Sequence, residues 1–143
     1  MKKVLFVAIG LVCIQFTARS QDQIKGYWLP EEGKSVIEIY AQDADRFSGK
    51  IVWMERAKNK DGELYTDRKN PEKALRDRSI LGLDMLYDLI YANDTWSGKL
   101  YTPKKGMTLD ATLSLVSDDR LKLTVSFRGF TKDQYWSRTV LPE

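Results

Sequence analysis

The sequence predicts an all-β fold: an up-and-down antiparallel β-barrel of about eight strands, with one short helix in a central loop. Two observations lead to this prediction. Runs in which apolar and polar residues alternate with a period of two follow one another along most of the chain, and clusters of Gly, Pro, Asn and Asp separate them. Each run has one apolar face. Strands in hairpin order bury such faces by closing into a barrel, which also removes exposed sheet edges.

The alternation places the predicted strands, and its clearest case is residues 107–116. There Leu109, Ala111 and Leu113 share one face, while polar residues occupy the other. A turn is predicted over residues 129–133, before the last strand. In chain order, the strands are expected within residues 21–29, 35–40, 47–56, 80–91, 96–102, 107–116, 121–128 and 134–141.

Residues 80–91 fit two patterns. The run LGLDMLYDLIY suits either an amphipathic helix or two short strands broken near Asp88. Gly82 disfavours a helix interior, and the neighbouring runs on both sides read as strands. We therefore favour strands here.

The central segment, residues 61–83, is the part of the chain that does not alternate. A helix is predicted over residues 71–77, with Asn70 as N-cap and Pro71 at the first helical position. Glu72 and Arg76 would then form an i,i+4 pair on its surface. A helix of two turns is unstable alone, so we expect the strands that it crosses to hold it.

The first residues have the pattern of a secretory signal peptide. Lys2 and Lys3 precede an apolar run over residues 4–16, and small residues lead to a cleavage site between Ser20 and Gln21. The run is shorter than the ~20 residues that a helix needs to cross a bilayer. We expect an exported protein, periplasmic or secreted, without a membrane span once the signal is removed.

Removal of a signal peptide of residues 1–20 would leave one barrel domain, residues 21–143. The full chain has 23 Lys and Arg against 20 Asp and Glu, and the signal peptide takes three cations with it, Lys2, Lys3 and Arg19. The mature chain would then have balanced charge. A protein without net charge is not expected to bind nucleic acid, so we predict no nucleic-acid partner.

The mature chain would also lack both cysteine and histidine. The chain has no His, and its one cysteine, Cys13, would leave with the signal. This composition excludes disulfides, Cys or His nucleophile and base chemistry, and ordinary zinc, copper or haem sites. We predict no cofactor, no metal and no enzyme of these types. A hydrolase or isomerase that uses Asp, Glu, Tyr or Lys stays open as an alternative.

Four polar residues of the central segment are candidate ligand contacts. Asp67, Asn70, Arg76 and Arg78 could gather at the barrel mouth, where the arginines would recognise a carboxylate or phosphate. The alternative is structural. Asp67 and Asn70 would cap turns, and the arginines would neutralise nearby acids in a loop that lies on the barrel.

Three aromatic residues, Trp53, Trp96 and Tyr101, complete the candidate ligand set. With neighbouring lysines they could also form a stacking surface for nucleic acid. The balanced charge of the mature chain favours ordinary barrel packing over that interpretation.

The two ends of the predicted barrel resemble the lipocalin and calycin signature. The chain has Gly26-Tyr27-Trp28 near its first strand and Tyr135-Trp136-Ser137-Arg138 in its last. In that signature a first-strand Trp packs against a basic side chain of the last strand and plugs one end of the barrel. The resemblance implies that Gly26, Trp28, Trp136 and Arg138 close the barrel. The Arg138 guanidinium would lie over the Trp28 indole, and backbone carbonyls of the N-terminal segment would accept its remaining N–H groups.

Further motifs resemble a secreted bacterial family known as domain of unknown function 2147. The resemblance covers essentially the whole mature chain. It implies a lipocalin-like barrel in a bacterial envelope or secreted setting and brings no established activity. The motifs are Asp67-Arg68-Lys69-Asn70-Pro71, Leu75-Arg76-Asp77-Arg78, Leu81-Gly82-Leu83, Trp96-Ser97-Gly98-Lys99-Leu100-Tyr101 and Pro103-Lys104-Lys105-Gly106.

These patterns predict a binding module. A barrel of about eight strands has room for a filled core or for one small ligand, and we expect a small apolar or amphipathic ligand. The alternative is a non-catalytic envelope interaction or structural module. Its barrel would be filled, and its outer face or central segment would dock a partner.

Overall fold

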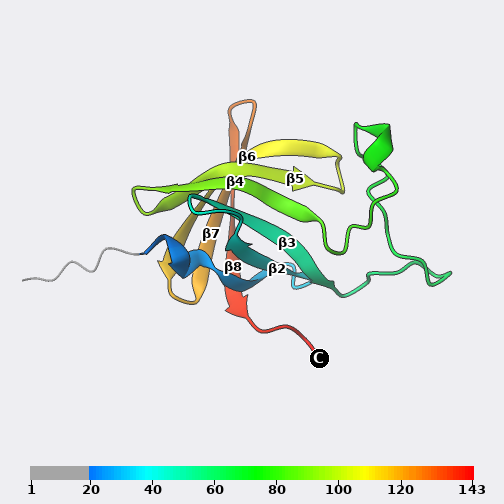
Figure 1. The fold of residues 1–143 in the computed structure, drawn as a ribbon, viewed down its shortest axis with the longest axis horizontal. Helices are drawn as coiled ribbons and strands as arrows, with labels where there is room; N and C mark the ends of the chain where they lie inside the picture. The colour runs from blue at the N-terminus through cyan, green and yellow to red at the C-terminus, as the bar shows by residue number, and fades with distance from the viewer. Residues whose placement is uncertain (1–19) are drawn as a thin grey trace, which may run out of the picture.

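The structure is a computed structural model that describes residues 20–143. Within these residues, the strands form one closed barrel in the order β1 to β8, with every neighbouring pair antiparallel and β8 paired to β1 (Figure 1). The fold class predicted from the sequence is confirmed. The elements are η1 (Gln21–Ile24), β1 (Gly26–Pro30), β2 (Ser35–Ala41), β3 (Arg46–Met54), η2 (Lys73–Leu75), β4 (Asp84–Ala92), β5 (Thr95–Thr102), β6 (Met107–Ser117), β7 (Arg120–Phe127) and β8 (Phe130–Thr139).

The inside of the barrel is packed with apolar side chains from β1 to β8. The largest are Trp28, Trp96, Trp136 and Phe47, each almost fully buried. Each comes from a different strand, and together with smaller aliphatic residues they form one core cluster. Removing this apolar surface from water stabilises the barrel. The alternation of apolar and polar residues in the sequence places these side chains on the inner face.

One end of the barrel, the plugged end, is covered by the 3₁₀ turn η1. Ile24 of η1 is fully buried in the core cluster, and its carbonyl accepts a 2.9 Å hydrogen bond from the Trp28 indole nitrogen. The Trp96 indole nitrogen donates to the Gln21 carbonyl at 3.1 Å. Two buried tryptophans thereby satisfy their polar groups on the backbone of the plug.

The opposite end of the barrel, the mouth, carries the β1–β2, β5–β6 and β7–β8 turns and the long β3–β4 segment, residues 55–83. In Figure 1 this segment is the green chain on the right, which runs out beyond the strands and contains η2. At the mouth, loops lie next to the core, whereas at the plugged end the 3₁₀ turn η1 covers it.

Residues 84–92 form one strand, β4, which settles the choice between helix and strand. The predicted break near Asp88 is an irregularity within β4, where the register with β5 shifts between Tyr87 and Ile90. Asp88 has a positive φ of 54°. The bulge bends the strand without ending it, because pairing resumes on both sides.

The helix predicted over residues 71–77 is wrong. The structure has only the 3₁₀ turn η2 (Lys73–Leu75), and Glu72 before it is extended, with φ −84° and ψ 112°. The Asn70 side chain accepts from the Glu72 backbone nitrogen at 2.8 Å, two residues ahead, which makes a turn and not a helix cap. The Arg76 Nε donates to the Asn70 carbonyl at 2.8 Å, so tertiary contacts override the local helix signals.

The turn predicted over residues 129–133 is also wrong. Strand β8 already begins at Phe130, directly opposite Phe127. The turn is Arg128 and Gly129 alone, both with positive φ, 48° and 83°. This is the two-residue hairpin geometry whose twist matches that of the flanking strands.

Residues 20–143 contain no helix that is long and apolar enough to cross a membrane. The predicted signal peptide lies outside the described residues, apart from Ser20 at its end. Export, and cleavage before Gln21, therefore stay predictions.

Candidate functional site

The clearest polar site is a cluster around the buried carboxylate of Asp67, which is 0% exposed. Its Oδ1 accepts a 2.6 Å hydrogen bond from the Tyr101 hydroxyl. Its Oδ2 accepts from Asn70 Nδ2 at 2.8 Å and from Arg78 Nε at 3.0 Å, and Arg78 Nη2 forms an ion pair with it at 2.9 Å. We call these four residues the Asp67 cluster. Both carboxylate oxygens have donors, as a buried charge requires.

The hydrogen bonds of the cluster set the charge of its central group. Burial alone would raise the pKa of Asp67, but the hydrogen bonds from Tyr101, Asn70 and Arg78 and the charge of Arg78 outweigh it, so the pKa is lowered. Burial and the bond to Asp67 raise the pKa of Tyr101. At neutral pH the cluster therefore holds an ionised Asp67 and a neutral Tyr101.

The Asp67 cluster lies on the outside of the barrel. Along β5, Trp96 and Leu100 belong to the core cluster, and Tyr101 follows on the opposite face, where it is buried outside that cluster. Asp67 belongs to the β3–β4 segment, which folds over this face. The Lys69 Nζ donates to the Lys104 carbonyl at 2.8 Å, which also joins the segment to the β5–β6 turn. The cluster thus fastens the segment to the barrel wall.

The structure brings together only part of the ligand set predicted from the sequence. Asp67, Asn70, Arg78 and Tyr101 form the cluster, and Arg76 reaches it through the Asn70 carbonyl. Because these polar groups bond one another, the geometry favours the structural alternative. Their role as ligand contacts stays a prediction.

The other two aromatic candidates lie elsewhere. Trp96 is in the core near the plugged end, where its ring centroid is 4.8 Å from that of Tyr91. Trp53 is half-buried and pairs with Val36 next to a register shift between β2 and β3. Neither contributes to the Asp67 cluster, so the sequence set does not form a single site.

A surface hollow of about 460 Å³ lies on the β3–β4 segment. It is shallow and carries both signs of charge. Of the candidates chosen from the sequence, only Arg76 lines it. Its lining residues are Glu63, Leu64, Thr66, Arg68, Arg76 and Asp77.

The mouth of the barrel has an apolar surface that no motif of the sequence marks. Five half-buried apolar residues pack there against the core cluster, and we call them the mouth residues. They stand at the ends of strands or in the β3–β4 segment, so only their apolar character beside predicted turns could have marked them. The mouth residues are Met54, Ile80, Leu81, Met85 and Leu109.

At the plugged end, the contact predicted between Arg138 and Trp28 is present. The two residues are partners in the β1–β8 register, and the guanidinium carbon of Arg138 lies 4.2 Å from the centre of the indole. Arg138 Nη1 and Nη2 donate to the Lys25 and Gln23 carbonyls, both at 2.8 Å, and Nε donates to the Asp118 carbonyl at 2.7 Å. Arg138 therefore joins the N-terminal segment, β8 and the β6–β7 turn.

The other two predicted closure residues flank this contact. A Cβ at Gly26 would lie 2.8 Å from Arg138 Nη1, so glycine leaves room for the guanidinium. Trp136 is buried in the core cluster. The whole arrangement serves stability, since the groups that it joins belong to the protein itself.

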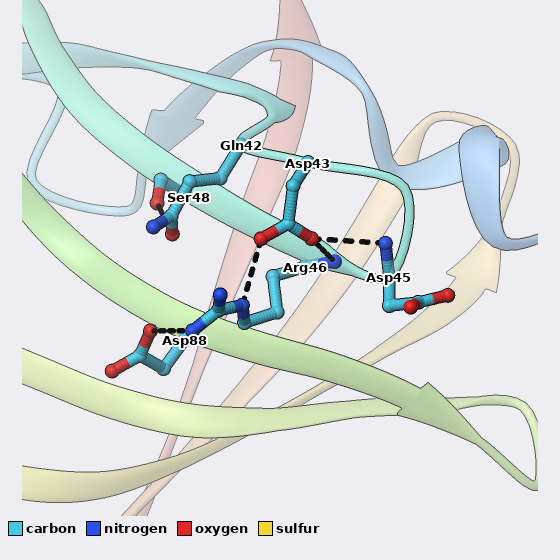
Figure 2. A network of polar contacts seen from close by, with 6 residues as sticks. All are labelled: Gln42, Asp43, Asp45, Arg46, Ser48 and Asp88. Carbon is cyan, nitrogen blue, oxygen red and sulfur yellow. Dashed lines mark hydrogen bonds and ion pairs between the residues drawn. The ribbon is translucent and has the colours of Figure 1, made fainter.

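A further polar network lies at the β2–β3 turn (Figure 2). Asp43 accepts from the backbone nitrogens of Asp45 and Arg46, at 3.0 and 2.9 Å, and from Arg46 Nε at 2.8 Å. Arg46 also reaches Asp88 on β4 at 3.5 Å. The backbone bond from Asp45, together with the bonds and charge of Arg46, lowers the pKa of Asp43. These contacts order a tight turn.

The acids of this turn do not form a metal centre. In the described part of the chain, no three His, Cys, Asp or Glu residues are grouped so that they could hold a metal ion.

Comparison with known proteins places this barrel in a family. The family DUF2147, described as an uncharacterized protein conserved in bacteria, matches residues 26–138. Among solved structures, the chain is similar to protein HP1028 from Helicobacter pylori, described as belonging to the lipocalin family. The identity is 25% over 81% of this chain and 82% of that chain, with a TM-score of 0.68. A search of curated proteins finds no match. The family match runs from the first residue of β1 to Arg138 in β8, and the chain belongs to the DUF2147 family of bacterial proteins, with a lipocalin-like barrel.

Proposed function

We propose that this protein is an exported, non-catalytic binding protein that takes one small apolar or amphipathic ligand at the mouth of its barrel. The observation that carries the proposal is the group of mouth residues, whose apolar side chains are only half-buried. The likeness to a lipocalin-family protein supports a binding role for this architecture.

The packed interior limits where a ligand would bind. Leu86 and Leu100, just inside the mouth, are buried members of the core cluster. A ligand would therefore rest on this core and be covered by the mouth residues. Methionine suits such a place, because its flexible, polarizable side chain adapts to differently shaped apolar groups, and Met54 and Met85 both lie there.

The β3–β4 segment positions part of this site. Ile80 and Leu81 belong to the segment, and the Ile80 backbone nitrogen donates to the Tyr65 carbonyl at 3.0 Å. The Asp67 cluster ties the same segment to β5. We infer that the cluster holds two mouth residues in place and acts on ligand binding through them.

The test compares two variants of one strand, β6. Leu109→Arg places a charge among the mouth residues, and Val116→Arg places it on the outer surface, where Val116 is 53% exposed. Each protein is purified from the cell that naturally produces it, and organic extracts are examined by mass spectrometry. We expect one small compound with the wild type and with Val116→Arg, and much less with Leu109→Arg.

Two results would overturn the proposal. One is a wild-type protein that yields no compound in repeated preparations. The other is a folded Leu109→Arg protein, checked by circular dichroism, that retains as much compound as the wild type.

Export has its own test, because the pattern of residues 1–20 supports it independently of the barrel. The intact mass of the protein from the producing cell should correspond to a chain that begins at Gln21. A mass that still includes residues 1–20 would contradict this part of the proposal.

A second candidate is an interaction or structural module with a filled barrel. It is favoured by the packing of Trp28, Trp96 and Trp136, which fill the inside together with aliphatic residues. A protein that copurifies specifically from envelope extract, combined with empty organic extracts, would favour this candidate over ligand binding.

A further inference from the structure

We propose that the tip of the β7–β8 hairpin docks the protein on an anionic lipid surface. The tip comprises residues 127–132, Phe127-Arg128-Gly129-Phe130-Thr131-Lys132. Phe127 and Phe130 face each other across the hairpin as the last pair of the β7–β8 register. Phe130 is 82% exposed and Phe127 is 40% exposed. Two exposed aromatic rings at one point of a protein surface need an explanation.

The hairpin presents these rings on a rigid support. Its register is continuous from Arg120 and Ser137 to the tip, and the two-residue turn has the geometry that such hairpins favour. In Figure 1 the hairpin is the orange loop that extends past β6 at the top of the view. Because the tip is already ordered, docking costs little conformational entropy.

The charges of the tip match a negatively charged surface. Arg128 and Lys132 carry positive charge, and residues 127–132 include no acid. The next acid along the chain, Asp133, is engaged by Lys122 at 3.5 Å and by the Thr124 hydroxyl at 2.6 Å, and Asp110, opposite Ser126 on β6, pairs with Lys99. Basic residues near a membrane surface are attracted by anionic lipid headgroups.

The relative positions of the aromatic rings and the basic side chains also suit a lipid interface. The Arg128 guanidinium lies over the Phe127 ring, 5.0 Å from its centre. With the rings among the upper acyl chains, this guanidinium would stand at the level of the lipid phosphates. Aromatic rings flanked by cations are typical of segments that bind at the membrane interface.

A lipid surface fits this tip better than a protein partner. A specific protein interface buries roughly 1,600 Å² in total and needs a complementary surface on both sides. The tip of one hairpin offers two rings and two cations. A bilayer accepts such a tip without a matching pocket.

This inference rests on residues other than those of the proposed ligand site, although both lie at the mouth end of the barrel. The mouth residues belong to β3, β4, β6 and the β3–β4 segment, whereas the tip belongs to β7 and β8. Loss of lipid docking would leave ligand extraction unchanged, and the reverse also holds.

The test is cosedimentation of the mature protein with phosphatidylcholine vesicles that do or do not contain phosphatidylglycerol. The test variant is Phe130→Ser, and the control is Val140→Ser, a residue 78% exposed beyond the end of β8. We expect binding to the vesicles with phosphatidylglycerol, weakened at least about fivefold by Phe130→Ser and unchanged by Val140→Ser. The double variant Arg128→Gln with Lys132→Gln should lose a similar factor at low salt and behave like the wild type at high salt.

Three results would overturn the proposal. The first is a wild-type protein that does not sediment with phosphatidylglycerol vesicles. The second is a folded Phe130→Ser protein that binds as the wild type does. The third is self-association in light scattering that Phe130→Ser abolishes without any effect of vesicles, which would assign the tip to a contact between two copies of this chain.

Discussion

The Tyr101 hydroxyl donates a hydrogen bond of 2.6 Å to the Asp67 carboxylate, although 34 residues separate the two in the chain. The bond joins the outer face of β5 to the β3–β4 segment. Arg78 strengthens the same junction, because its guanidinium pairs with Asp67 and lies 5.5 Å from the centre of the Tyr101 ring. The β3–β4 segment, which has no regular strand, is thus held on the barrel by the buried Asp67 carboxylate and its hydrogen-bond donors.

Replacing Tyr101 by Phe should weaken this junction. The change removes one donor from a buried carboxylate and leaves Asn70 and Arg78 in place, so we expect a loss of about 1–3 kcal/mol in the free energy of unfolding. Urea denaturation measures it. The control Tyr87→Phe removes an exposed hydroxyl whose bond to Thr108 is 3.4 Å long, and it should change stability little. Equal stabilities of the two variants would contradict the role assigned to Tyr101.

The Asp67 cluster should make stability depend on acid pH. Because the pKa of Asp67 is lowered in the folded protein, its contribution is fully present above the unfolded value of about 3.9 and is lost as the pH falls through the lower, folded value. The difference in unfolding free energy between wild type and Asp67→Asn should therefore be largest near neutral pH and shrink below about pH 4. Urea denaturation across this range tests it.

A matched control for the acid experiment is Asp61→Asn, in an exposed turn of the same β3–β4 segment. Its stability should follow the wild-type curve with pH. A constant gap between wild type and Asp67→Asn at every pH would show that the charge of Asp67 does not act as described.

Replacing Arg138 should loosen the plugged end. Arg138→Ala removes the stacking on Trp28 and three donors to backbone carbonyls, so we expect a loss on the order of 1–3 kcal/mol. Arg138→Lys should recover only part of this, because an ammonium group cannot stack as a plane or donate as a fork. Chemical denaturation checks both. Wild-type stability of Arg138→Ala would contradict the closure role.

A side chain at Gly98 should lower the stability of the barrel. An added Cβ would lie 2.6 Å from the carbonyl oxygens of Tyr87 and Asp88, at the bulge of β4. Because these are backbone atoms in a closed barrel, Gly98→Ala should cost about 1–3 kcal/mol, whereas Ser97→Ala, exposed on the same strand, should cost little. Thermal and urea unfolding measure both. A stable Gly98→Ala protein would mean that the bulge can relax.

The sequence by itself determined the barrel and its plugged end. Alternation with a period of two is a local property, and between bulges it assigns strand residues to the inside or the outside without knowledge of their neighbours. Strands in hairpin order then make β1 and β8 neighbours. The resemblance of the two ends to the lipocalin signature points to Trp28 and Arg138 as the residues that meet there, and the structure pairs them.

Only the tertiary structure decided what the β3–β4 segment and the ends of the strands do. The local signals of Asn70 and Pro71 predict a helix, but Asn70 bonds to Asp67 and Glu72 in a turn. Whether Asp67 faces a ligand or Tyr101 depends on contacts between distant residues, which no local pattern encodes. For the same reason the mouth residues and the exposed hairpin tip became visible only when the strands were placed around one core.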